Sequence, residues 1–447
     1  MFSRARTVAA VLAVLTAYVY FGSGRTWSFP RVPWERTHQQ RFTERYYAGQ
    51  AEGFLRGRLD LPYPIDPRWK NVTNAYDFGA RDAQGLGWEM WDASLYNGRF
   101  YLYFSPVPVV LFYLPFRLIG GGYPSDPLAA TFFLSWAFLA SVAFLRRAEA
   151  RPTWILVVGL ANVAPYMLGF VRAYEVAVAA GMAMTATFAY MLLRWYESQQ
   201  TRHAVWAGLW LALAMATRPN LIVLGVVFVY VLRRHRRALA FALIPLVAVG
   251  GAMMLYNYAR FSNPFELGIT YQISYAPMWR AAPCSLCDVP TAIRFVNNTV
   301  HYVFWAPRFV SEFPYVAMQK NALDPSVSFA GGAEEILGVA ALNPLTLLGS
   351  FVALALLSRR ESRLRAALAV MACAWLVLFG LATCRWVTAR YALDFMMLMT
   401  VAAVVCIEQA RALIPARTRL LAIVIGGVAL YAIVVGLLLA FRSAAAA

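Results

Sequence analysis

Apolar runs of about 20 residues, the length that crosses a roughly 30 Å hydrocarbon core as a helix, recur along nearly the whole of this 447-residue chain. Only helices and closed barrels satisfy their backbone hydrogen bonds inside a bilayer. Charged residues make up 14% of the chain, whereas soluble domains carry about 25%. The sequence therefore excludes a soluble globule and predicts an all-α polytopic membrane protein.

These runs predict about eleven transmembrane helices. The first is a signal-anchor span at residues 1–22, because two arginines precede its apolar run and no small-x-small cleavage site follows. The other ten are expected near residues 125–145, 152–171, 174–194, 203–217, 219–232, 237–257, 335–357, 364–383, 391–408 and 419–441. Since 203–217 and 219–232 are short for two spans, Pro219 and Asn220 are expected to turn the chain within the membrane thickness.

The apolar segment 101–121 needs separate treatment because it contains three prolines and ends in a run of glycines. It is either a kinked span or a re-entrant or surface-lying segment. If it does not cross, the arginine clusters between the other spans all face the cytoplasm, as the positive-inside rule requires. If it crosses, all of them face outward. We therefore predict that residues 101–121 do not cross.

This topology divides the chain into five parts and places its unusual polar residues on one side. The parts are the signal-anchor span (1–22), a large first extracytoplasmic loop with amphipathic helices and the re-entrant segment (23–124), a transmembrane core (125–257), a second extracytoplasmic loop (258–334) and C-terminal transmembrane helices (335–447). We expect a multi-pass protein of the bacterial inner (plasma) membrane whose active site faces the periplasm.

The net charge of +18 does not indicate a nucleic-acid partner. It resides almost entirely in arginines grouped between apolar runs, the distribution that orients helices in a membrane. Cys284 and Cys287 form a C-x-x-C motif in the second outer loop, with no second pair and no nearby histidine. A local disulfide is therefore favoured there over a zinc site or a redox motif.

The first outer loop carries carboxylates among aromatic residues. Asp92 follows Trp91 and precedes a turn at Tyr96, just before the chain reaches the membrane. It is the first choice for a general base that accepts a proton from a hydroxyl about 3 Å away, with aromatic rings able to stack on a sugar. The alternative is a capping or solvated aspartate. Glu44 and Asp77 are the next candidates for the base, with an exposed charge or an Asx turn as their alternatives.

Charged residues also gather at the outer ends of apolar spans, where they are costly and therefore suggest function. The predicted binding residues are Arg390, Arg218, Tyr391, Asp394, Arg260, Glu175 and Tyr96. Arg218 and Arg390 could hold a lipid phosphate by paired hydrogen bonds. Alternatively, they snorkel or pair with Asp394 and Glu175. Glu175 could equally be a carboxylate favoured by a helix N-terminus.

These features resemble the GT-C superfamily of polyprenyl-phosphate-dependent glycosyltransferases, which includes protein O-mannosyltransferases and lipid A aminoarabinose transferases. The resemblance is architectural and covers most of the chain. It rests on the N-terminal span with a large outer loop, the stretch from Tyr46-Tyr47 to Gly57-Arg58-Leu59, the Gly-Arg-Phe-Tyr and Pro-Val-Pro sequences, Arg-Pro at 218–219 and Arg-Tyr at 390–391. The chain departs from the family where an acidic residue, often Asp-Glu, usually precedes the Tyr-rich helix. Here that place holds Thr43-Glu44-Arg45.

The resemblance implies an integral membrane enzyme that transfers a sugar, with inversion, from a polyprenyl-phosphate donor to an extracytoplasmic glycan, lipid or protein. A carboxylate would act as base and arginines would stabilise the leaving lipid phosphate. No Gly-rich phosphate loop follows a strand, which disfavours a nucleotide-sugar donor. The outer-loop carboxylates do not form a recognisable ligand set, so no metal site is predicted, although the need for a divalent cation stays open.

Two other functions remain as alternatives. A flippase or transporter of lipid-linked sugars would be expected to show repeat symmetry, charged residues near the midplane and short outer loops, and this chain has the opposite pattern. A surface-polysaccharide polymerase or ligase would share the lipid-linked substrate and differ mainly in where its large outer loop falls.

Overall fold

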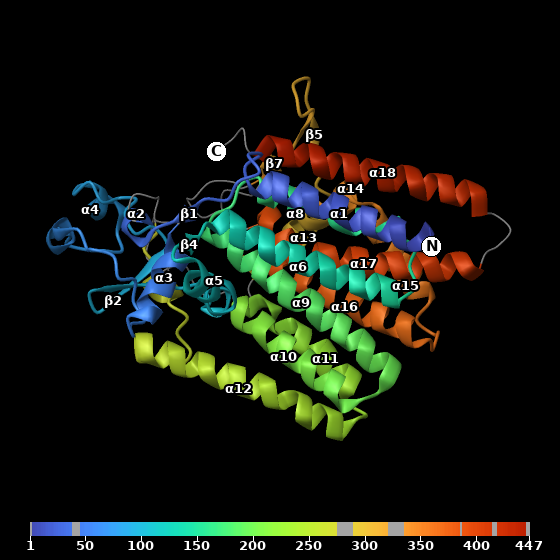
Figure 1. Cartoon of the computed structure of the whole chain (residues 1–447), viewed down its shortest axis with the longest axis horizontal. Helices are drawn as coiled ribbons and strands as arrows, with labels where there is room; N and C mark the ends of the chain where they lie inside the picture. Colours follow the sequence, from blue (N-terminus) through green and yellow to red (C-terminus); the bar gives the residue numbers. More distant parts are fainter. Residues whose placement is uncertain are drawn as a thin grey trace.

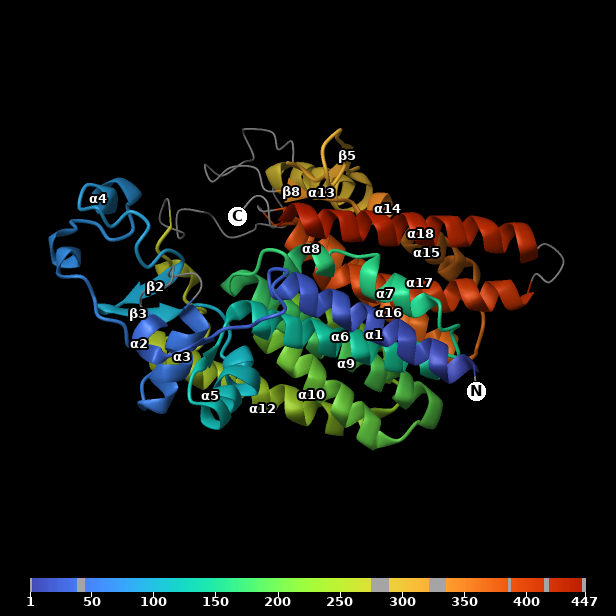
Figure 2. The same ribbon diagram turned by 45° about the horizontal axis from the view of Figure 1, so that its top comes forward.

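The computed structural model describes residues 2–37, 45–274, 289–320, 335–384, 387–413 and 418–443. Long helices dominate these residues and form a bundle, and a smaller cap of short helices and strands projects from one end of it (Figure 1). A second view shows the cap at the same end (Figure 2). The apolar runs thus form one helical body, and the polar stretch after the first helix lies outside it.

Seven helices are long and apolar enough to cross a membrane, counting the described residues only. They are α1 (Phe2–Gly22), α6 (Asp126–Arg147), α9 (Ala173–Ser198), α12 (Arg236–Phe261), α16 (Ser362–Ala382), α17 (Ala389–Leu413) and α18 (Thr418–Ser443). Of these, α9 and α17 are the most completely buried and form the centre of the bundle. The chain is therefore a mostly helical protein with several helices suited to cross a membrane, as predicted.

The predicted count of eleven long spans is wrong for the part of the chain that the structure describes. Four of the expected spans are short or interrupted. Residues 152–171 form α7 (Trp154–Leu160) and α8 (Ala164–Leu168), 203–217 form the 17-residue α10 (Thr201–Thr217), 219–232 form the 3-10 helix η4 (Pro219–Val223) and α11 (Leu224–Leu232), and 335–357 form β8 (Glu335–Ile336), α14 (Val339–Leu342) and α15 (Leu345–Ala355).

Proline and asparagine account for three of these interruptions. A proline cannot donate an intrahelical hydrogen bond, so it opens the helix that follows a break. These prolines are Pro165, Pro219 and Pro344. Asn162 Nδ2 donates to the Val158 carbonyl at 2.6 Å, and Asn343 Nδ2 donates to the Ala161 carbonyl at 3.1 Å. The breaks near residues 162 and 343 therefore lie together, and asparagine side chains bind the carbonyls released there.

The apolar segment 101–121 is too short a helix to cross the bilayer on its own. It begins in strand β3 (Arg99–Leu102) and continues as the π-helix η3 (Val109–Tyr113) and then α5 (Leu114–Gly120). From Val109 to Gly120 the helical part measures about 18 Å at 1.5 Å per residue, against roughly 30 Å of hydrocarbon. Gly121, with φ of 75°, ends it in the left-handed conformation.

The cap consists of short elements joined by two small sheets. Its elements are β1 (Arg31–Val32), α2 (Trp34–Thr37), α3 (Tyr46–Leu55), η2 (Pro67–Asn71), α4 (Phe78–Asp82), β2 (Ala93–Tyr96), β3, η3, α5 and β4 (Tyr123–Pro124). Strand β1 pairs with β4, and β2 pairs with β3, both antiparallel. Asn97 and Gly98 turn the second hairpin with φ of 49° and 71°, as a two-residue hairpin turn requires.

A second, smaller group of elements separates α12 from α15. It contains η5 (Ile269–Tyr271), α13 (Val289–Phe304), the pair β5 (Arg308–Phe309) and β6 (Val316–Ala317), and the pair β7 (Gln319–Lys320) and β8. The residues just after η5 join the cap, because the Ile273 N–H donates to the Ala93 carbonyl at 2.8 Å. The predicted outer loops 23–124 and 258–334 therefore contact each other at this end of the bundle.

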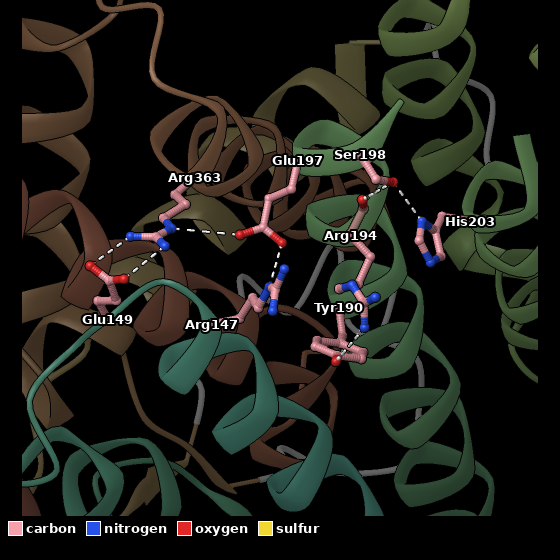
Figure 3. Close-up of polar contacts among 8 residues, drawn as sticks. All are labelled: Arg147, Glu149, Tyr190, Arg194, Glu197, Ser198, His203 and Arg363. Carbon is pink, nitrogen blue, oxygen red and sulfur yellow. Dashed lines mark hydrogen bonds and ion pairs between the residues drawn. The ribbon is translucent and has the colours of Figure 1, made fainter. Parts of the chain in front are cut away.

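At the opposite end of the bundle, arginines lie at or near the ends of α6, α9 and α16, and we call it the arginine end. Arg147 lies 2.6 Å from Glu197, and Arg363 lies 2.7 Å from Glu149 and 3.6 Å from Glu197. Figure 3 shows these groups in one network that joins the ends of α6, α9 and α16, with Arg194 beside them. Salt bridges that are this exposed contribute little individually, so their main effect is to fix which helix ends meet.

Close approach through small residues holds the bundle together. A Cβ atom added to Gly349 on α15 would lie 2.2 Å from the Ala403 Cβ on α17, and one added to Gly208 on α10 would lie 2.2 Å from the Ala242 carbonyl on α12. Helices in membranes associate chiefly through such tight packing, because lipid chains are as apolar as the side chains they replace.

Gly349→Ala should therefore destabilise the bundle, by about 1–3 kcal/mol, because it overpacks a tight contact. Thermal unfolding of the purified protein in detergent measures the effect as a lower midpoint. The matched control is Gly250→Ala on α12, where the added methyl would meet nothing within 4 Å. Equal midpoints for the two variants would contradict the packing described here.

Candidate functional site

Charged and aromatic side chains from the cap and from several helix ends meet where the cap joins the bundle. We call this group the polar cluster. Its members are Asp92, Tyr103, Tyr174, Glu175, Arg218, Asn220, Gln272, Arg390, Tyr391 and Asp394. It combines the preferred base with the two arginines expected to bind phosphate, although these residues are far apart in the sequence.

Asp92 is buried in this cluster, and its hydrogen bonds to Ile273, Gln272 and Tyr174 help to hold it there. Its backbone N–H donates to the Ile273 carbonyl at 2.8 Å, and its Oδ1 accepts from Gln272 Nε2 at 2.6 Å. Its Oδ2 accepts from the hydroxyl of Tyr174. The residue has φ of 62°, a conformation that is costly for a side chain other than glycine and is tolerated where surrounding contacts enforce it. Asp92 is thus neither a helix cap nor a solvated turn residue.

Tyrosines pack around this carboxylate. The hydroxyl of Tyr46, on α3, donates to the Trp91 carbonyl. Burial raises the pKa of Tyr46 well above its ordinary value, and the negative charge of Asp92 adds to the shift. Burial and Asp92 also raise the pKa of Tyr103. Both phenols therefore stay protonated around neutral pH and are able to donate hydrogen bonds.

Tyr174 connects Asp92 to Arg390. Its hydroxyl binds Asp92, while the Arg390 guanidinium lies 5.0 Å from the centre of its ring. Arg390 Nη1 also lies 3.7 Å from Glu175 Oε1. The other oxygen of Glu175 accepts the backbone N–H of Arg172 at 2.8 Å, which caps α9. Glu175 is therefore a helix-terminal carboxylate and also an ion-pair partner of Arg390, and its role in binding stays a prediction.

Arg218 and Asp394 form the second ion pair, and it is the more deeply buried one. Arg218 Nη2 lies 2.6 Å from Asp394 Oδ2, and the side chains are only 13% and 0% exposed. Asn220, in η4, donates to the same oxygen at 3.0 Å. The guanidinium lies 4.9 Å from the ring centre of Tyr391, and Arg390 lies 5.5 Å from the same ring. Tyr391 thus contacts both arginines.

The cluster retains unused hydrogen-bonding capacity. Among the described residues, the buried Nε of Arg218 and the buried hydroxyl of Tyr47, on α3, have no hydrogen-bond partner. Buried polar groups are normally satisfied, so donors of this kind suit a site that binds an anion or a polyol.

Three predicted site residues lie outside the polar cluster. Asp77 is exposed and caps α4, accepting the Ala80 N–H at 2.8 Å. Arg260 is buried at the end of α12, where it donates to the Leu102 carbonyl at 2.7 Å and ties that helix to the cap. Tyr96 packs against the aromatic rings of Phe261, at the end of α12, and Tyr271, in η5. Glu44 and the pair Cys284–Cys287 lie outside the described residues.

Four members of the cluster were not among the predicted site residues, namely Tyr103, Tyr174, Asn220 and Gln272, although Asn220 was expected to turn the chain. Tyr174 and Tyr103 carried a usable signal, since Tyr174 precedes Glu175 and Tyr103 follows the Gly-Arg-Phe-Tyr sequence. Gln272 carried none, because an isolated glutamine in an irregular loop has no periodicity to indicate its position. Across the described residues, no group of three or more His, Cys, Asp or Glu side chains could hold a metal ion.

Comparison with known proteins does not assign the chain to a family. No protein-family model matches it, and no curated protein is significantly similar to it in sequence. Any functional conclusion must therefore come from the chemistry of the polar cluster and from the membrane setting of the bundle.

Asp394→Ala should strongly destabilise the protein, by about 3–5 kcal/mol, because it leaves Arg218 buried without its partner. The double variant R218M/D394L removes both charges and should recover much of the loss. Unfolding midpoints in detergent report both effects. Glu149→Ala, which removes a carboxylate that is 71% exposed from its pair with Arg363, is the control and should change little. If Asp394→Ala lowers the unfolding midpoint no more than Glu149→Ala does, the buried ion pair does not stabilise the fold.

Proposed function

We propose that this chain is an integral membrane glycosyltransferase that moves a sugar from a polyprenyl-phosphate donor to an extracytoplasmic acceptor, with inversion. The observation that carries the proposal is the link through Tyr174, which brings the Asp92 carboxylate and the Arg390 guanidinium to one site. A buried base beside a phosphate-binding cation is what such a transfer needs. The acceptor is a cell-envelope glycan, lipid or protein.

In the proposed reaction Asp92 is the general base. It accepts the proton of the acceptor hydroxyl as the acceptor oxygen bonds to the anomeric carbon, and the bond from that carbon to the phosphate oxygen breaks. The lipid phosphate leaves with the bonding electrons. Gln272 and Tyr174 position the carboxylate, because each binds one of its oxygens.

Arg390 and Arg218 would bind the phosphate. Each already faces a carboxylate, Glu175 or Asp394, and these ion pairs hold the guanidinium groups in place before the donor arrives. A guanidinium has five N–H donors, so pairing with one carboxylate leaves others available. The buried Nε of Arg218 is one such donor. Arginine is well suited to this role because its planar group can bind two phosphate oxygens at once.

The surroundings of the cluster suit a lipid-linked donor. Leu118 and Ile119, on α5, are strongly exposed, and so is Val110 on η3. A helix of the cap that exposes such apolar side chains would bury them in the acyl region of the bilayer. We propose that residues 101–121 form a re-entrant or surface segment of this kind. The donor's tail would then stay in the bilayer while its sugar reaches the polar cluster.

We further propose that the cap faces the periplasm of a bacterial inner membrane and that the arginine end faces the cytoplasm. Cysteine labelling tests this in a background lacking the native cysteines. A membrane-impermeant thiol reagent applied to intact cells should modify Arg99→Cys, on the cap hairpin, and should leave His235→Cys and Ser362→Cys unmodified until the membrane is opened. Labelling at position 235 in intact cells would reverse the topology.

Asp92→Asn should lower the rate of sugar transfer roughly 100-fold or more, because it removes the proton acceptor while keeping the side-chain volume. Lipids and surface glycan are extracted from a deletion strain complemented with each variant. We expect the polyprenyl-phosphate sugar to accumulate and the glycan to lose that sugar with Asp92→Asn.

Asp77→Asn is the matched control, since Asp77 is an exposed carboxylate of the same cap that caps α4 outside the polar cluster, and it should restore wild-type levels. Loss of activity in Asp77→Asn but not in Asp92→Asn would reassign the base. If the deletion itself changes neither lipid nor glycan, the transport alternative is favoured. If the deletion changes the length of the glycan rather than its sugar content, a polymerase or ligase is favoured.

A further inference from the structure

A cavity of about 450 Å³ opens at the arginine end, and we call it the basic pocket. The ends of α9 and α11 and the start of α16 line it. Three arginines contribute to its wall, namely Arg233, Arg234 and Arg365. It lies at the opposite end of the bundle from the polar cluster, and nothing in the proposed transfer uses it.

The charge of this pocket is not neutralised by the protein. No acidic residue lines it, and within the described ranges none of its three arginines forms an ion pair, whereas many arginines elsewhere do. A second cavity at the same end, lined by Arg4, Arg146 and Arg151, differs in this respect. Glu149 lines that cavity, and Arg151 lies 2.5 Å from Glu408.

Aromatic rings hold two of the guanidinium groups in place. The Arg233 guanidinium lies 3.5 Å from the ring centre of Tyr230, and its Nη1 donates to the Tyr230 carbonyl at 2.6 Å. The Arg365 guanidinium lies 5.9 Å from the ring centre of Tyr196. Stacking of this kind orients an arginine while leaving most of its N–H groups available to a ligand.

An exposed apolar stripe leads along the bundle to the basic pocket. Ile222, Val226 and Tyr230 lie four residues apart, so they follow one face of η4 and α11, and they are 60%, 67% and 62% exposed. Tyr230, at the end of the stripe, also lines the pocket. An acyl chain could lie along this stripe while its headgroup occupies the pocket.

We propose that the basic pocket binds the phosphate-bearing headgroup of an anionic phospholipid from the leaflet at the arginine end. A cluster of arginines beside a membrane helix attracts such headgroups, and a guanidinium pairs well with phosphate oxygens. The cavity is large enough for a glycerophosphate group. Free phosphate shares this chemistry but makes no use of the apolar stripe. The inference stands independently of the proposed transferase activity.

The test uses the full chain, purified in neutral detergent and stripped of lipid. Binding of phosphatidylglycerol is measured by native mass spectrometry, and the unfolding midpoint is measured with and without the lipid. The test variant is R234Q/R365Q, and the matched control is R4Q/R146Q, which removes the same number of charges from the neighbouring cavity. We expect the lipid to raise the wild-type midpoint. In the test variant binding should weaken roughly tenfold or more, and in the control it should not.

Two further arms separate the sources of the phosphate. Phosphatidylcholine micelles should not raise the midpoint, because that lipid carries no net charge, and inorganic phosphate at millimolar concentration should have little effect. Equal stabilisation by inorganic phosphate would overturn the lipid assignment, and unchanged phosphatidylglycerol binding in R234Q/R365Q would overturn the pocket. If the double variant folds poorly, Arg234→Gln alone, an exposed side chain, provides the same comparison.

Discussion

One constraint governs this structure: inside the hydrocarbon of a membrane, every backbone N–H and C=O group needs a hydrogen-bond partner. It explains the long helices, and it also explains where the chain departs from them. The interrupted segments near residues 162 and 343 lie together, so that Asn343 binds the carbonyl of Ala161 while Asn162 binds its own helix. Irregular backbone is tolerated in the bundle because asparagine side chains supply the hydrogen bonds that water cannot.

One of the interruptions builds the polar cluster. The chain leaves α10 at Arg218 and turns through η4, so Arg218 and Asn220 can both reach Asp394 on α17. An unbroken helix could not present both side chains to one carboxylate, because residues two positions apart on a helix point in different directions. Gly181 on α9 supplies the room, since a Cβ there would lie 2.6 Å from Arg218 Cγ. A local break in helical regularity thus brings the side chains of Arg218, Asn220 and Asp394 together.

The sequence predicted the helical class and several members of the cluster, because both follow from the free-energy cost of placing unpaired backbone groups or charged side chains in a membrane. Long uniform apolar runs form helices in a membrane. Charged residues in or at the ends of these runs, such as Arg218, Arg390 and Asp394, are energetically costly and therefore suggest a functional or structural role. The number of long spans could not be predicted, because a run interrupted by one asparagine or proline keeps nearly the same hydropathy. The same argument also selected Arg260, which lies outside the polar cluster and whose buried guanidinium donates to the Leu102 carbonyl. Gln272 needed the tertiary structure.

Tyr174 and Glu175 are neighbours in the first turn of α9, and they contact Asp92 and Arg390 respectively. The first turn of one buried helix therefore positions both the Asp92 carboxylate of the cap and the Arg390 guanidinium of the bundle. A displacement of this one turn would consequently move the carboxylate and the guanidinium together.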